Sequence, residues 1–133
     1  MFEILMGVPE MKEFWDDLKT RKKKNNLSGD EKELFKKFGK AIQFLAADPR
    51  HRGLQTHEID DLTRRYGQKV FQSYLGQGKH AYRMFWVYGP DRKQITIIGL
   101  EPHPEDAKSG AYDRIKLSDF RSLNIPGRIS LSV

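Results

Sequence analysis

The spacing of apolar residues changes halfway along the chain, and this change constrains the fold more than any other feature. Up to residue 45, apolar side chains recur at helical spacing in two segments. From residue 69 onward they form short runs rich in aromatic and β-branched residues, separated by turn sequences. Helices grouped before strands predict an α+β fold, in which two N-terminal helices pack on one face of a small, mainly antiparallel sheet.

The element boundaries follow from local signals. We expect a strand over 1–6, a helix over 9–20, and a second helix that begins at the capping box Ser28-x-x-Glu31 and ends by Asp48, because Pro49 follows. The segment 48–67 is predicted to be mostly loop. Strands are expected over 69–75, 81–88 and 94–100, the last two joined by a reverse turn, and the alternating end 128–133 is typical of an edge strand.

Charge and cysteine content narrow the functional classes. Lys plus Arg number 24 against 18 for Asp plus Glu, which gives a net charge of +6 and a pI near 9.5. This surplus favours polyanionic partners such as nucleic acid or an acidic protein. The chain has no cysteine, so disulfides and thiolate chemistry are excluded. The apolar runs are too short for a membrane span, and the N-terminus does not look like a signal peptide, so we expect a cytoplasmic protein without membrane partners.

Two cations in the strand region are candidate phosphate ligands. Arg83 lies inside an otherwise apolar strand, where an arginine needs a partner. It either forms a salt bridge with an acidic residue such as Asp60 or Glu101, or it presents its planar donors to a phosphate on an open sheet face. Lys69, at the start of the preceding strand, would add a second cation if it lay beside Arg83.

Other candidates are spread along the chain. His103 is held between Pro102 and Pro104, which suits a ring that must be placed for proton transfer. His57 and Glu58 precede the strands, and either is a base or a structural residue. Further candidates for substrate contact are Tyr112, Arg64 and Arg65, each of which also has an ordinary packing or solvated interpretation. The four histidines show no metal-ligand spacing, so we expect neither a metal nor another cofactor.

The ordered motifs resemble the RelE/ParE superfamily of bacterial toxins from type II toxin–antitoxin systems. The resemblance covers 1–117 and leaves 118–133 as a C-terminal extension of unknown role. The motifs that carry it are Asp48-Pro49…Gly53-Leu54…His57, Lys69-Val70-Phe71-Gln72-Ser73-Tyr74-Leu75, Tyr82-Arg83-Met84-Phe85-Trp86-Val87-Tyr88, and Ile97-Ile98-Gly99-Leu100-Glu101-Pro102-His103-Pro104-Glu105-Asp106.

The resemblance implies a toxin that is neutralised by an acidic antitoxin and that cleaves mRNA on the ribosome without a metal, thereby inhibiting translation. By the same implication, Arg83 and Lys69 hold the scissile phosphate, His103 is the general acid, Glu58 is the base, and Tyr112 orients the RNA. Two alternatives stay open: a ParE-like inhibitor of gyrase without nuclease activity, and a non-toxic nucleic-acid-binding module of the same fold.

Overall fold

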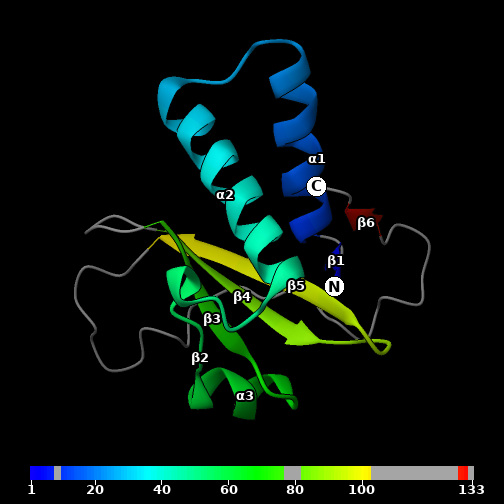
Figure 1. Cartoon of the computed structure of the whole chain (residues 1–133). Helices are drawn as coiled ribbons and strands as arrows, with labels where there is room; N and C mark the ends of the chain where they lie inside the picture. The colour runs from blue at the N-terminus through cyan, green and yellow to red at the C-terminus, as the bar shows by residue number, and fades with distance from the viewer. Residues whose placement is uncertain (8–9, 77–81, 103–128, 132–133) are drawn as a thin grey trace.

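The structure is a computed structural model that describes residues 1–7, 10–76, 82–102 and 129–131. Figure 1 shows an α-helical hairpin standing on one face of a twisted sheet. Along the chain the elements are β1 (Glu3–Met6), α1 (Glu10–Lys23), α2 (Gly29–Ala47), the 3₁₀ helix η1 (Arg52–Leu54), β2 (His57–Glu58), α3 (Asp60–Tyr66), β3 (Phe71–Leu75), β4 (Tyr82–Tyr88), β5 (Gln94–Pro102) and β6 (Ile129–Leu131). The predicted α+β class is therefore confirmed.

The described strands form one mixed sheet in the order β2-β3-β4-β5-β1-β6. The β3–β4–β5 meander is antiparallel, whereas β1 runs parallel to β5. At the end of the chain, β6 pairs antiparallel with β1 and forms an edge, as the alternation of 128–133 predicts. The last part of the C-terminal extension thus belongs to the same sheet as the rest of the chain.

The helical hairpin is closed at its tip by one ion pair. Arg21 of α1 donates two hydrogen bonds of 2.6 Å to the carboxylate of Glu31 in the first turn of α2. Glu31 also completes the capping box with Ser28, as the sequence predicts. The guanidinium of Arg21, together with the Ser28 backbone N–H, lowers the pKa of Glu31 from 4.5 to about 2. One carboxylate therefore both starts α2 and joins it to α1.

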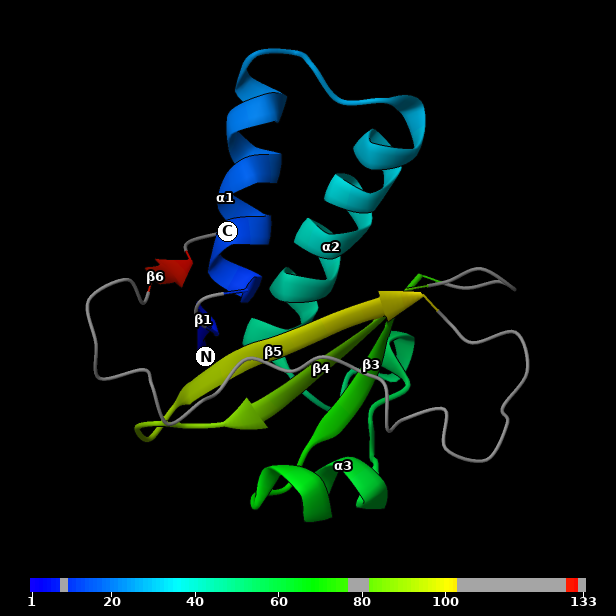
Figure 2. The ribbon, with the colours of Figure 1, turned by 180° about the vertical axis from the view of Figure 1, so that it is seen from behind.

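The sheet buries apolar side chains on both faces. On the hairpin face, Met84, Trp86 and Ile97 pack with residues of α1 and α2 such as Phe38 and Ile42. On the opposite face, Ile59 and Leu62 at α3 pack with Val70, Phe85, Val87 and Ile98. Figure 2, seen from behind, shows α3 on the side of the sheet away from the hairpin.

The prediction that 48–67 is mostly loop is wrong, because η1, β2 and α3 all lie within it. These elements are two to seven residues long, so apolar periodicity cannot reveal them. Leu62 is the buried residue of α3, and the helix ends at Gly67, whose φ of 85° suits glycine. Because α3 covers part of the second face, that face is less open than the sequence suggests.

A series of hydrogen bonds, buried at Trp86 and half-buried at Thr56, fixes the segment that joins α2 to the sheet. Trp86 Nε1 donates to Ser73 Oγ at 2.9 Å, Ser73 and Thr56 hydroxyls lie 2.7 Å apart, and Thr56 Oγ1 donates to the Pro49 carbonyl at 2.8 Å. Because the Thr56 hydroxyl already donates its hydrogen to the Pro49 carbonyl, the Ser73 hydroxyl must donate to Thr56. We call this series the hydroxyl bridge. It holds residues 49–56 against the sheet.

We expect Ser73→Ala to lower the free energy of unfolding by about 1–3 kcal/mol, because Trp86 N–H and the Thr56 hydroxyl both lose a buried partner. Chemical denaturation measures the change. Thr20→Ala removes a hydroxyl from an exposed helical position and should change stability by less than about 0.5 kcal/mol. Equal unfolding free energies for Ser73→Ala and the wild type would contradict the role of the bridge.

The Glu31 pKa makes a prediction about acid stability. A carboxyl whose folded pKa is lowered stabilises the folded state above its unfolded pKa, and this contribution disappears as the pH falls through the folded value. The difference in unfolding free energy between wild type and Glu31→Gln should therefore have its full size above pH 4.5 and disappear near pH 2. Denaturation at a series of pH values tests this, with Glu13→Gln at an exposed position as the control. A difference that is constant across the window contradicts the prediction.

Candidate functional site

The sheet register places Arg83 on the face opposite the helical hairpin. Arg83 lies between Tyr74 of β3 and Glu101 of β5. Phe85, two residues further along β4, points to the same face and belongs to the apolar cluster under α3. Only 2% of Arg83 is exposed. The guanidinium Cζ lies 5.7 Å from the Phe85 ring centroid. Arg83 is thus a buried cation rather than an exposed phosphate ligand.

Two side chains, Gln72 and His57, connect Arg83 to the surface. Arg83 Nη1 donates to Gln72 Oε1 at 2.7 Å, and Gln72 Nε2 lies 3.4 Å from His57 Nε2. On the other side of the ring, His57 Nδ1 lies 3.2 Å from the Gln55 carbonyl oxygen. Gln72 is buried, whereas His57 is exposed. We call this arrangement the Arg83–Gln72–His57 relay.

The relay determines which nitrogen of His57 carries the proton. A guanidinium can only donate, so Gln72 must turn its carbonyl oxygen to Arg83 and its amide N–H toward His57. His57 Nε2 then accepts, and Nδ1–H donates to the Gln55 carbonyl. In the neutral imidazole, the relay therefore places the proton on Nδ1 and the lone pair on Nε2. The 3.4 Å contact between Gln72 and His57 is long for a hydrogen bond.

Glu58 is engaged in local structure. Its Oε2 accepts a hydrogen bond of 2.9 Å from Thr63 Oγ1, which in turn accepts from the Val70 backbone N–H at 2.9 Å. These bonds join β2, α3 and the start of β3. Glu58 is half-buried. Its carboxylate holds α3 in place, which makes it a poorer candidate for a base than the neighbouring histidine.

The other predicted cations do not gather around Arg83. Lys69 is exposed and precedes β3, five residues from Tyr74, the residue opposite Arg83. At about 3.3 Å per residue this separation is about 17 Å along the strand. Arg64 pairs with Asp61 on α3, and Arg65 is exposed on the same helix. The predicted Arg83–Lys69 pair is therefore not formed. His103 and Tyr112 lie outside the described residues.

Two further properties concern the described residues alone. Within 1–7, 10–76, 82–102 and 129–131, no three His, Asp or Glu side chains gather in a group that could hold a metal ion. None of the helices in this part of the chain is long and apolar enough to cross a membrane.

The sequence analysis missed Gln72. The available signal was a polar side chain within each of two neighbouring apolar strands, Gln72 in 70–75 and Arg83 in 82–88. A register was needed to see that these side chains share a face.

Compared with family models, with curated proteins and with solved structures, the chain matches none of them. Function must therefore be inferred from the residues themselves.

The relay predicts opposite tautomers for two histidines. His57 should carry its proton on Nδ1, whereas His51, whose Nδ1 accepts from the Gly53 N–H at 3.0 Å, should carry it on Nε2. Long-range ¹H–¹⁵N correlation spectra, recorded where both rings are neutral, distinguish the two forms. In Gln72→Glu a carboxylate oxygen faces His57, so its proton should move to Nε2 while His51 stays unchanged. A wild-type His57 with its proton on Nε2 would contradict the relay.

Proposed function

We propose that this protein is an endoribonuclease similar to RelE-type toxins, which cleaves mRNA and thereby stops translation. The observation that carries the proposal is the Arg83–Gln72–His57 relay, which orients an exposed imidazole at the surface of a basic protein. The order of helices and strands and the net charge of +6 support it. An acidic antitoxin, the ribosome as the place of cleavage, and the cytoplasm as its location belong to the same proposal.

The reaction is an internal transfer that needs one base and one acid. His57 Nε2 takes the proton of an RNA 2′-OH, and the resulting oxygen attacks the adjacent phosphorus. The bond from phosphorus to the 5′-oxygen breaks, which leaves a 2′,3′-cyclic phosphate on one fragment. The 5′-oxygen must receive a proton as it leaves. By resemblance to the family, we assign this proton to His103.

Arg83 is a positioning residue in this proposal. Its burial prevents direct contact with RNA, so it acts through Gln72, whose amide orientation it fixes. Lys69 is exposed just before β3 and lies far from Arg83. In that position it suits a flanking phosphate rather than the scissile one. Glu58, the base implied by the family resemblance, gives way to His57 because Thr63 already occupies its carboxylate.

The decisive experiment follows cleavage of labelled mRNA by the purified protein, with and without ribosomes. We expect cuts within the reading frame with cyclic-phosphate ends, and a loss of about 10²–10⁴-fold in rate for His57→Ala. Gln72→Glu, which keeps a partner for Arg83, should lower the rate at least about tenfold because Nε2 no longer offers a lone pair. Arg92→Ala, at an exposed turn remote from the relay, serves as the control.

Two results would overturn the proposal. Full cleavage by a folded His57→Ala variant would remove His57 from the reaction. Intact mRNA under all conditions, together with loss of DNA supercoiling by gyrase, would instead support the ParE-like alternative. If RNA stays intact and gyrase stays active, the remaining interpretation is a nucleic-acid-binding module without toxicity.

A further inference from the structure

A groove of about 470 Å³ lies between α2 and the segment that the hydroxyl bridge fixes to the sheet. Three lysines of α2 line one side, and three rings from different elements line the rest. The residues are Lys36, Lys37, Lys40, Phe44, His51 and Tyr74. All three lysines are exposed, and Glu33 is the acidic residue of the lining. The groove therefore combines a surplus of positive charge with flat rings.

The rings of the groove are held in fixed positions. Phe44 and His51 stack with centroids 4.1 Å apart and planes 7° from parallel. A Cβ on Gly53 would lie 3.1 Å from His51 Nδ1, so any side chain at this position would press on the ring. The Gly53 N–H also donates to Nδ1 at 3.0 Å, which leaves Nε2–H of a neutral His51 as a donor. The stack is thus a rigid platform with a polar edge.

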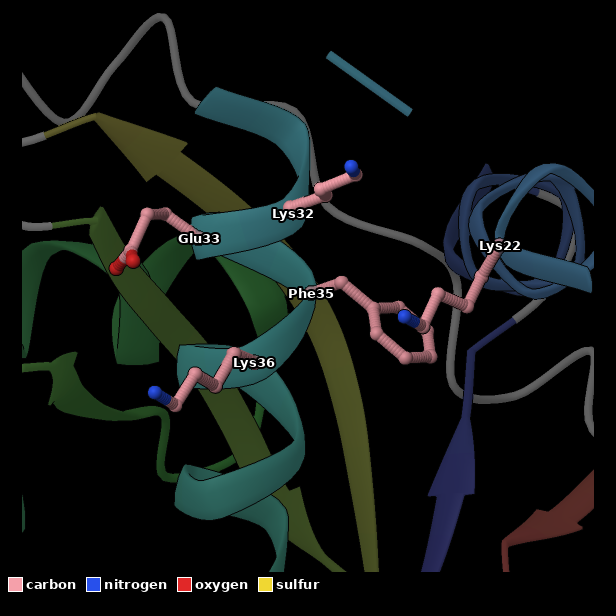
Figure 3. A pocket seen from close by; sticks show the side chains of 5 residues that line it. All are labelled: Lys22, Lys32, Glu33, Phe35 and Lys36. Carbon is pink, nitrogen blue, oxygen red and sulfur yellow. The ribbon is translucent and has the colours of Figure 1, made fainter. Parts of the chain in front are cut away.

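The lysines are placed along the same groove. Lys40 Nζ lies 5.7 Å from the Phe44 ring centroid, and the stem of Lys37 lies over Gly76, whose Cβ position would be 3.4 Å from Lys37 Cδ. Lys36 also lines a second hollow of about 390 Å³, together with Lys22, Lys32 and Phe35. Figure 3 shows Lys36 and Glu33 projecting from the side of α2 away from α1, and Lys22 reaching toward Phe35. The positive charge therefore continues from the groove along α2.

We propose that the groove binds a single-stranded RNA segment, whose phosphates lie on the α2 lysines and whose bases stack on the rings. Cations beside stacking rings are the combination that recognises single strands, because every base offers a flat face. The groove also meets the relay, since Tyr74 lines it and lies 6.5 Å from the His57 ring. That the strand is RNA, and that it continues to His57, rests on the proposed function.

An acidic protein segment is the competing occupant. It would satisfy the lysines but would make no use of the Phe44–His51 ring stack. A duplex would also satisfy the lysines, but its bases are paired and cannot stack on the platform. The ring stack therefore favours a single strand.

The test measures the salt dependence of binding of a fluorescent 2′-O-methyl oligonucleotide of about ten nucleotides to the full chain. The methyl group blocks the attacking oxygen, so binding is measured apart from cleavage. Replacing Lys36, Lys37 and Lys40 by Ala should reduce the slope of log K against log salt by about 2, since each single-strand contact contributes about 0.7. Gly53→Ala, which displaces His51 without changing charge, should weaken binding about tenfold.

A second triple variant, Lys19→Ala, Lys24→Ala and Arg92→Ala, removes the same charge from exposed positions outside the groove and should leave the slope nearly unchanged. Equal slopes for the two triple variants, or equal affinity for the oligonucleotide and a matching duplex, would overturn the proposal. So would groove-dependent binding of a polyglutamate peptide without binding of the oligonucleotide. Oligonucleotide binding without cleavage of natural RNA would keep the groove and overturn the nuclease proposal alone.

Discussion

The hydroxyl bridge from Trp86 through Ser73 and Thr56 to Pro49 is the interaction on which the candidate site depends. It ties the chain between α2 and β2 to the centre of the sheet, in addition to the buried side chain of Leu54. His51 lies within this tethered stretch and His57 comes directly after it. The bridge therefore fixes the backbone from which both rings project, while contacts with Phe44 and Gly53 hold His51 and contacts with Gln72 and Gln55 hold His57.

Two neighbouring residues of β3 take part in different hydrogen-bond systems on opposite faces of the sheet. Ser73 faces the hairpin side and belongs to the bridge, whereas Gln72 faces the other side and connects Arg83 with His57. Alternation along a strand sends successive side chains to opposite faces, so one short strand serves both purposes. Leu75 and Phe71 continue the apolar face on the hairpin side. A register slip of one residue would exchange the two faces and destroy both arrangements at once.

Sequence reasoning predicts the long elements well and the site poorly, for physical reasons. The capping box of α2 and the three strands of the meander are marked by several local signals in the sequence, and the structure contains all of these elements. A two-residue strand such as β2 leaves none. The pairing of Gln72 with Arg83 depends on strand register, which two separate apolar runs do not specify. The predicted pairing of Lys69 with Arg83 fails for the same reason, because the register places Arg83 opposite Tyr74, five residues from Lys69.

The burial of Arg83 explains why the relay has a single direction. Removing a guanidinium from water is costly, and the group cannot lower that cost by losing its proton. It must instead orient acceptors toward itself, and the Gln72 carbonyl is one of them. The side-chain N–H of Gln72 must therefore point outward to His57. A buried charge thus fixes the donor that Gln72 presents to an exposed ring, and the proposed proton transfer at His57 would use this preorganisation.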